Sequence, residues 1–179
     1  NMKLAGTALT VEVGPGDNLM IHAAMSLAKP GDVLVIDGKG VQTAALMGTI
    51  MMTACRKLGI AGVVVDGAVR DSLEIEEMGF PVFSVGTNPN GPTKQVSGRI
   101  GHPVSVGGVT VYPGDLIVAD ADGVVAIERV RVAALVPLAD KKVRDEAARI
   151  AAIEQGDTAA KWLDAALRTA GVLKEGERL

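Results

Sequence analysis

The chain has 179 residues, a length typical of one domain with a buried core, and its 48% of apolar residues exclude a disordered chain. Only 2% of the residues are aromatic, so we expect a core of small aliphatic side chains and an oligomer that supplies part of the stability. The net charge of −3, without a basic patch, argues against nucleic-acid binding, and the single cysteine, Cys55, excludes an internal disulfide and a cysteine-based metal cluster.

Strands and helices alternate at the start of the chain. Residues 4–13 predict a strand, and Asp17 follows a Gly-Pro-Gly turn as the cap of a helix over residues 18–28. Residues 33–36 are entirely apolar and predict a short buried strand. A Gly-rich loop at residues 37–40 comes next.

The same alternation continues through the following fifty residues. Residues 42–58 are rich in Ala and Met and predict a long helix, which Gly59 closes. The elements predicted after it are a buried strand over residues 62–66, a tight turn over residues 67–70, a helix over residues 73–78 and a strand over residues 80–85. This order is typical of an α/β fold with a parallel sheet and right-handed crossovers.

The second half of the chain changes to short strands separated by glycine-rich turns, after a loop-rich stretch that begins at residue 86. The predicted strands are residues 104–106, 109–111, 116–118 and 124–127. We expect them to form an antiparallel or mixed β-layer. After Glu128 the pattern becomes amphipathic helix, over residues 130–153 and 158–169, and we expect these helices to pack on a neighbouring subunit.

We expect one domain over residues 1–179, with an α/β core at residues 1–128 and a C-terminal helical arm at residues 129–179. The longest apolar runs are too short to span a membrane and no signal peptide is visible, so we expect a soluble cytoplasmic protein. Residues 1–3 lead directly into the first strand, and we expect a segment upstream of them to be missing.

The strongest chemical signal is the pair Arg70 and Asp71, which follows a buried strand. Ligands of open α/β sheets bind at the carboxyl ends of the parallel strands. An arginine holds a carboxylate through two parallel hydrogen bonds, and an aspartate is a hard ligand for Mg²⁺ or Mn²⁺. The pair therefore suits an anionic substrate that chelates a metal, whereas the alternative is a surface ion pair with Asp71 as the cap of the next helix.

A second candidate site is the turn formed by Gly48, Thr49, Ile50 and Met51. Backbone amides near the start of a helix bind carboxylate or phosphate oxygens. The alternative is an ordinary turn between a strand and a helix. The Gly-rich loop at residues 37–40 lacks the spacing of the known nucleotide-binding motifs, so we predict no nucleotide site.

The other chemically active residues give weaker signals. Asp120 and Asp122 place carboxylates two residues apart, but an aspartate-rich hairpin turn accounts for them better than a metal site does. His22 and His102 have no evident relation to each other, so we predict no histidine metal site. Cys55 lies within the predicted helix, next to Ala54, and is expected to fill space in the core.

Six motifs, in order and with matching spacing, resemble the RraA-like family across residues 6–156. They are Gly16-Asp17-Asn18, Pro30-Gly31-Asp32-Val33, the segment from Gly62 to Asp71, Gly107-Gly108-Val109, Pro113-Gly114-Asp115-Leu116 and residues 119–125. The resemblance implies an α/β sandwich with a β/β/α swivelling-type core, assembled as trimers or hexamers with active sites between subunits. Its enzymatic branch is the metal-dependent (class II) 4-hydroxy-4-methyl-2-oxoglutarate and 4-carboxy-4-hydroxy-2-oxoadipate aldolases, and some members carry a methyltransferase label without a methyl-donor site.

The resemblance also implies roles for single residues. In the aldolases the residue that matches Arg70 holds pyruvate and polarises its oxo group, and the residue that matches Asp71 binds Mg²⁺ or Mn²⁺. Backbone amides matching residues 48–51 hold the pyruvate carboxylate, and a glutamate of a neighbouring subunit, matched by Glu146, approaches the metal. Thr49 departs from the family pattern, which has Asp or Glu there, and threonine cannot act as a base near neutral pH. We therefore expect a lower metal affinity or rate, or a different substrate.

The expected reaction is cleavage of a 4-hydroxy-2-oxo diacid to pyruvate and a second 2-oxo acid. The metal and Arg70 polarise the 2-oxo group, a base, expected to be water held by the metal, takes the 4-hydroxyl proton, and the C3–C4 bond breaks. Oxaloacetate decarboxylation gives the same pyruvate enolate and is the expected side activity. No Schiff-base lysine is required, although Lys39 and Lys94 are the loop lysines to check for one.

The alternative function is a non-catalytic RraA-type protein that binds and regulates the ribonuclease RNase E. The regulatory branch of the family generally lacks the acidic partner of the arginine, and this chain keeps it as Asp71, which favours the enzyme.

Overall fold

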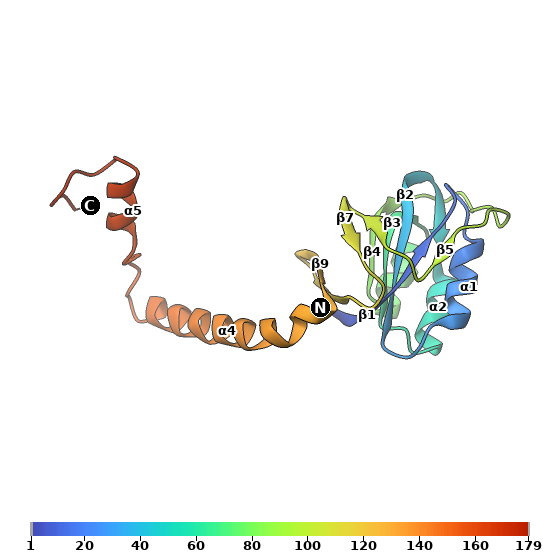
Figure 1. The fold of residues 1–179 in the computed structure, drawn as a ribbon, viewed down its shortest axis with the longest axis horizontal. Helices are drawn as coiled ribbons and strands as arrows, with labels where there is room; N and C mark the ends of the chain where they lie inside the picture. The colour runs from blue at the N-terminus through green and yellow to red at the C-terminus, as the bar shows by residue number, and fades with distance from the viewer. Residues whose placement is uncertain (1, 179) are drawn as a thin grey trace. The chain divides into compact units, whose positions relative to one another are not determined.

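The computed structural model describes residues 2–178, so the two end residues of the predicted domain lie outside the described range. It divides into two compact units, one that ends at Val132 and one that begins at Ala133. The first unit contains the sheet and the helices α1 to α3, and the second contains most of α4 and all of α5 (Figure 1).

A seven-stranded mixed sheet forms the centre of the first unit, with the strand order β4-β3-β2-β1-β8-β9 and with β5 paired to the end of β1. The strands β1 to β4 are parallel, and β8, β9 and β5 are antiparallel to their neighbours. Their bounds are β1 Leu4–Glu12, β2 Asp32–Met47, β3 Gly62–Val69, β4 Val82–Thr87, β5 Arg99–Ile100, β8 Leu116–Asp120 and β9 Gly123–Ile127.

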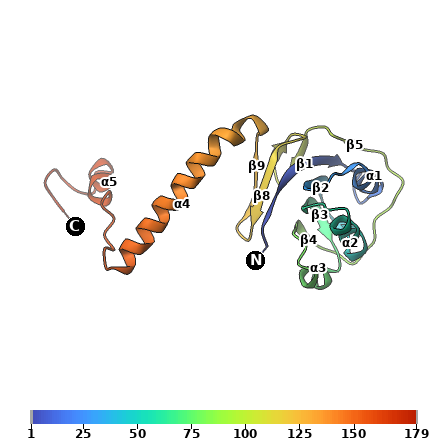
Figure 2. The same cartoon turned by 90° about the horizontal axis from the view of Figure 1, so that it is seen from below.

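Three helices cover one face of this sheet (Figure 2). They are α1 Leu19–Leu27, α2 Thr49–Lys57 and α3 Ser72–Met78. Their buried side chains Ile21, Met52 and Ile75 belong to one core cluster with Leu34 and Val63 of the sheet. Burying such an aliphatic side chain stabilises the fold by roughly 1.5–3 kcal/mol, so these contacts fix the helices on the sheet.

A two-stranded hairpin lies against the opposite face. It consists of β6 Val104–Val106 and β7 Val109–Val111. Val104 and Val111 pack into a second core cluster with Val35 and Val64 of the sheet. The predicted α/β sandwich is therefore confirmed, with the order helices, sheet, hairpin; however, β8 and β9 extend the main sheet and do not belong to the second layer.

The predicted long helix over residues 42–58 is wrong in its first part. β2 continues to Met47 because Ala45 and Met47 pair with β3, and Leu46 between them is fully buried. The helix starts only after Gly48, whose backbone is extended at φ −150° and ψ −170°. Sheet pairing and burial thus override the high helix propensity of the Ala- and Met-rich sequence.

The predicted turn at residues 67–70 is also wrong, because β3 runs on to Val69. Ala68 pairs with Gly86 and Val69 with Thr87, so the strand lies between β2 and β4 along its whole length. The pair Arg70 and Asp71 therefore follows the end of the strand directly, ahead of α3.

The other predicted short strands are present; Asp120 ends β8, and Asp122 lies in the turn to β9. The Asp122 amide donates a hydrogen bond of 2.9 Å to Asp120 Oδ1, which is the hairpin alternative. Cys55 is fully buried, as expected, and this burial raises the pKa of its thiol to about 12.

In the second unit, α4 extends over Val132–Glu154 and α5 over Leu163–Thr169, close to the two predicted helices. No residue of α4 is buried, and the ion pairs on its surface include one between Lys142 and Glu146 at 3.1 Å. Packing of this arm on a neighbouring subunit stays a prediction. None of the helices within residues 2–178 is long and apolar enough to cross a membrane.

Candidate functional site

The candidate site lies at the carboxyl ends of β2 and β3, where Gly48 meets Arg70 and Asp71. The Arg70 amide donates a hydrogen bond of 3.0 Å to Met47 O, which joins the two strand ends. A Cβ atom on Gly48 would lie 2.5 Å from Asp71 Oδ2 and 2.8 Å from Arg70 Cγ. Only glycine therefore lets both side chains lie against the start of α2.

Asp71 links the end of β3 to the first turn of α2. Its Oδ2 atom accepts a hydrogen bond of 2.9 Å from the Thr49 amide and lies 3.7 Å from Arg70 Nε. Within residues 2–178 no hydrogen bond engages the other oxygen, Oδ1, and the side chain is 36% exposed. Its backbone is left-handed at φ +59°, a conformation that costs a non-glycine residue about 1–3 kcal/mol and clusters at functional sites.

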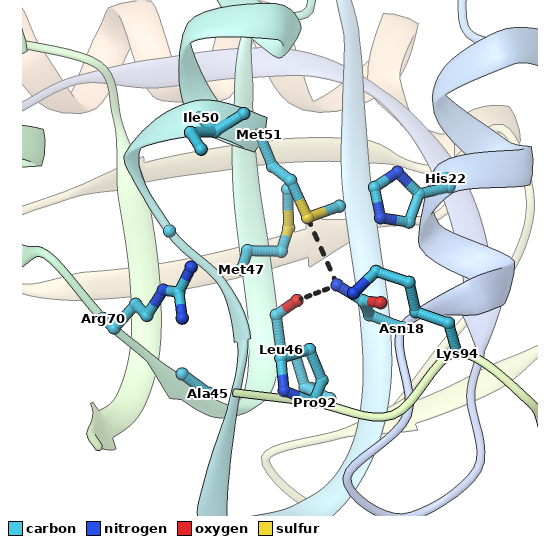
Figure 3. A pocket seen from close by; sticks show the side chains of 11 residues that line it. Asn18, His22, Ala45, Leu46, Met47, Ile50, Met51, Arg70, Pro92 and Lys94 are labelled. Atoms are coloured by element: carbon cyan, nitrogen blue, oxygen red, sulfur yellow. Dashed lines mark hydrogen bonds between the residues drawn. The ribbon is translucent and has the colours of Figure 1, made fainter. Parts of the chain in front are cut away.

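Arg70 and the start of α2 line one pocket of about 170 Å³ (Figure 3). Gly48, Ile50 and Met51 form the α2 side of the pocket. The remaining lining residues are Asn18, His22, Ala45, Leu46, Met47, Pro92 and Lys94. The guanidinium group and the free amides of a helix start favour an anion, and the small volume favours a small one.

Two buried oxygen atoms near the pocket lack hydrogen-bond partners within the described chain. Asn18 donates through Nδ2 to Leu46 O at 2.8 Å and to Met51 Sδ at 3.3 Å, which leaves its Oδ1 unpartnered. Thr49 Oγ1 is unpartnered as well. Buried polar atoms nearly always have hydrogen-bond partners, so each of these two atoms is available to a ligand or a water.

The wall that carries Lys94 is held in place by Asp17. Asp17 Oδ2 accepts hydrogen bonds from Thr93 Oγ1, the Gln95 amide and the Val96 amide at 2.7, 2.6 and 3.1 Å. Burial alone would raise the pKa of Asp17, but these hydrogen bonds and one from Leu19 outweigh it and lower the pKa to about 2. The Leu19 amide donates the fourth bond, to Asp17 Oδ1 at 2.9 Å. The helix cap predicted at Asp17 is wrong by one residue, because Asn18 caps α1 and its carbonyl accepts the first helical hydrogen bonds.

The structure brings four of the predicted site residues, Gly48, Ile50, Met51 and Arg70, to one pocket. Asp71 does not line it; with Arg70 it lines an adjacent depression of about 290 Å³ that also includes Thr87, Asn88 and Pro89. Thr49 contributes its amide to Asp71, and its side chain does not line the pocket. Glu146 lies in the second unit, and its part in the site stays a prediction.

Three polar lining residues, Asn18, His22 and Lys94, are absent from the predicted site. Asn18 appears in the sequence only as part of a motif, His22 only as a rejected metal ligand and Lys94 only as a lysine to check. Lys39, the other lysine to check, is bonded to Asp37 and Glu12 at 2.8 and 2.9 Å, which raises its pKa, and it does not line the pocket.

The described residues near Arg70 offer few ligands for a divalent cation. Residues 2–178 contain no cluster of three or more His, Cys, Asp or Glu side chains that could enclose a metal. Asp71 offers one unengaged carboxylate oxygen. Mg²⁺ is often bound by one or two carboxylates together with water and substrate oxygens, so this donor set fits Mg²⁺ or Mn²⁺ rather than a closed structural zinc site.

Comparisons with known proteins show the family of the chain. The family model described as RraA-like, Aldolase/RraA, matches residues 1–126. A protein of Halalkalibacterium halodurans named "Putative 4-hydroxy-4-methyl-2-oxoglutarate aldolase" is 46% identical over 153 residues, which are 86% of this chain and 73% of that protein.

Two solved structures are similar to this chain in sequence and in fold. One is described as "Crystal structure of S-adenosylmethionine: 2-dimethylmenaquinone methyltransferase from geobacillus kaustophilus HTA426"; it is 37% identical, with a TM-score of 0.69, over 72% of this chain and 80% of its own. The other, "Structure of the RNA-processing inhibitor RraA from Thermus thermophilis", is 33% identical, with a TM-score of 0.67, over 72% of this chain and 77% of its own.

Proposed function

The chain belongs to the RraA-like family, and from this membership and the pocket at Arg70 we propose that it is a divalent-metal-dependent aldolase. The proposed reaction cleaves a 4-hydroxy-2-oxo diacid, such as 4-hydroxy-4-methyl-2-oxoglutarate, to pyruvate and a second 2-oxo acid. Oxaloacetate decarboxylation is the proposed side activity. The name of the Halalkalibacterium halodurans relative supports this substrate class.

The observation that carries the proposal is the shared pocket of Arg70 and the α2 start. Arg70 and the start of α2, where the amides of Ile50 and Met51 are unengaged, line one pocket of about 170 Å³. Drug-sized ligands occupy about 300–1,000 Å³, so this pocket suits a molecule as small as pyruvate. For the same reason the methyltransferase description of the Geobacillus structure gives no argument for a methyl-donor site in this chain.

We propose that Mg²⁺ or Mn²⁺ binds at Asp71, through the carboxylate oxygen that Thr49 does not engage. Glu146 of a neighbouring subunit in a trimer or hexamer is proposed to complete the site. The cation would act as a Lewis acid that polarises the 2-oxo group of the substrate.

The residues of this chain position the substrate and stabilise the charge that develops. The α2 amides hold the carboxylate next to the oxo group, and Arg70 donates hydrogen bonds to the oxo oxygen. When the 4-hydroxyl proton leaves, the C3–C4 bond breaks and its electrons form the enolate of pyruvate. Arg70 stabilises that negative charge more in the transition state than in the ground state, and such donors are typically worth about 10²–10³ in kcat.

Pyruvate release tests the proposal. The wild-type chain is expected to release pyruvate from 4-hydroxy-4-methyl-2-oxoglutarate and from oxaloacetate with Mg²⁺, and EDTA is expected to stop it. Arg70→Ala should abolish pyruvate release. Arg70→Lys keeps the positive charge but loses the bidentate hydrogen-bond geometry, so it should retain a fraction of the wild-type rate. Absence of metal-stimulated release from every 4-hydroxy-2-oxo diacid tried would refute the enzyme.

The second candidate is a binding protein that inhibits RNA processing. The similarity to the Thermus structure supports it, since that protein is described as such an inhibitor. Under this alternative the chain binds and inhibits RNase E, and Arg70→Ala leaves that inhibition unchanged. An RNase E cleavage assay with and without the chain separates the two candidates.

A further inference from the structure

His22 brings an imidazole group to the pocket that contains Arg70. It extends from α1, whereas Arg70 comes from the end of β3, and Met47 and Met51 lie between them in the view (Figure 3). The His22 side chain is exposed, and no hydrogen bond within residues 2–178 engages either of its ring nitrogens. The ring is therefore free to bond a ligand in the pocket.

Aldol cleavage needs a group that accepts a proton and returns it, and no carboxylate of the described chain lines the pocket. Thr49 carries a hydroxyl, and Asp71 lines the adjacent depression with one oxygen already bonded to the Thr49 amide. The charged lining residues are Arg70 and Lys94, types that are ordinarily protonated near neutral pH. Imidazole is the side chain that ordinarily changes charge between pH 5 and 8.

We propose that His22 is the catalytic acid–base residue of the aldol cleavage, an inference that rests on the proposed function. Neutral His22 takes the proton of the substrate 4-hydroxyl through its unprotonated ring nitrogen. The oxygen left behind forms the carbonyl of the departing 2-oxo acid, and the C3–C4 electrons form the enolate. The imidazolium then returns the proton to C3 of the enolate, which gives pyruvate and neutral His22.

The groups that face His22 are consistent with this role. Arg70 and Lys94 are the charged groups, from the β3 end and from the loop after β4, and α2 presents the uncharged Ile50 and Met51. With the first carboxylate of the substrate on the α2 amides and the oxo oxygen on Arg70, Lys94 is the cation that matches the second carboxylate of a diacid. The substrate hydroxyl hydrogen is then left to the imidazole.

Substitution of each of the two histidines gives a matched comparison. His22→Gln is expected to lower kcat by about 100-fold or more, with little change in KM, and to remove the limb of the pH–rate profile that belongs to the base. His102→Gln is the control, because His102 is exposed and does not line the pocket. Free imidazole is expected to restore rate to His22→Ala, a recovery that a structural role would not produce.

A binding measurement tests the placement without turnover. Proton NMR of the chain should show two sets of histidine ring signals, and His22→Gln identifies one of them. Oxamate, a stable analogue of pyruvate, is expected to shift the His22 signal and leave the His102 signal in place. An oxamate complex in which the His22 signal does not move would overturn the inference.

The outcomes distinguish failure of the proposed aldolase activity from failure of the proposed role of His22. If the wild-type chain releases no pyruvate, the aldolase activity is refuted, independently of the role of His22. Wild-type chain that is active, together with a His22→Gln variant of unchanged kcat and unchanged pH profile, overturns the role of His22 and leaves the aldolase standing.

Discussion

Gly48 is the residue on which the geometry of the site depends most closely. Gly48→Ala adds a methyl group 2.5 Å from Asp71 Oδ2 and 2.8 Å from Arg70 Cγ, so these two side chains must move. We expect pyruvate release to fall by about 100-fold, because a displacement of about 1 Å at a catalytic group costs this much. Overpacking should also lower the free energy of unfolding by about 1–3 kcal/mol. Steady-state kinetics and denaturant unfolding measure the two effects.

Gly86→Ala is the matched control for that variant. Its added Cβ would lie 2.9 Å from Gln42 Oε1, the end of a flexible, exposed side chain that can move away. The control should keep its activity. Equal losses in both variants would show that Gly48 acts only through general stability and does not position Arg70 and Asp71.

Among single residues, the sequence predicts those whose role follows from local pattern. Arg70 and Asp71 follow a buried strand, and residues at that position face the ligand side of an α/β sheet. His22 and Lys94 could not be predicted as neighbours of Arg70, because a helix from the first crossover and a loop from residues 88–98 come together only in the folded chain. The contacts of Asp17 with Thr93, Gln95 and Val96 create this proximity and leave no sign in the local sequence.

At the scale of elements, the loop that carries Lys94 is anchored to the start of α1 by one carboxylate. Asp17→Asn replaces an oxygen that accepts bonds from Gln95 and Val96 with an NH₂ group, and we expect a loss of about 2–3 kcal/mol of unfolding free energy at pH 7. The pKa of Asp17 falls from 3.8 to about 2 on folding, so its charged form stabilises the fold above the unfolded value. That stabilisation is lost as pH falls from about 4 through 2.

Denaturant unfolding of wild type and Asp17→Asn at pH 7, 4 and 3 checks this prediction, and the gap between them should narrow toward low pH. Asp120→Asn serves as control, because Asp120 is exposed and its carboxylate accepts a single bond within a hairpin turn. An Asp17 variant as stable as wild type at pH 7 would show that the loop is held by other contacts.

The order of strands and helices can be predicted from the sequence wherever a single hydrophobic periodicity, that of a strand or that of a helix, dominates a segment. The buried strands near Val33 and Val63 are fully apolar, so their places could be predicted. The Gly-rich loop predicted at residues 37–40 is wrong, because β2 continues through it to Met47. Residues 42–47 could not be predicted as a strand, because Ala and Met favour a helix locally and only pairing with Ala68 and Val69 of β3 makes this segment a strand. Long-range pairing also explains why β3 continues through Gly67, where a turn is predicted.

At the scale of the whole molecule, the proposed site needs two chains. Within the described range, Asp71 is the carboxylate that pairs with Arg70, at 3.7 Å. The helix α4 of the second unit carries Glu146 together with exposed apolar side chains such as Val143 and Ile150. An amphipathic helix without buried residues of its own favours packing on a second copy. Both features support an oligomer with composite sites.

Complementation tests this arrangement. Arg70→Ala and Glu146→Gln are each expected to be inactive alone, and chains carrying one or the other should regain activity when they are refolded together. Mixed oligomers contain some sites with an intact Arg70 from one chain and an intact Glu146 from another. Activity assays and light scattering of the mixture measure recovery and oligomeric state. A mixture that forms oligomers but stays inactive would contradict a shared site.

A crystal structure of the chain with Mn²⁺ and oxamate tests the proposed site most directly. An anomalous Mn²⁺ peak is expected at the Asp71 oxygen that Thr49 does not engage. The oxamate carboxylate is expected on the amides of Ile50 and Met51, with the amide carbonyl of oxamate facing Arg70. Mn²⁺ bound away from Asp71, or oxamate bound outside the pocket of Arg70, would contradict the proposed site.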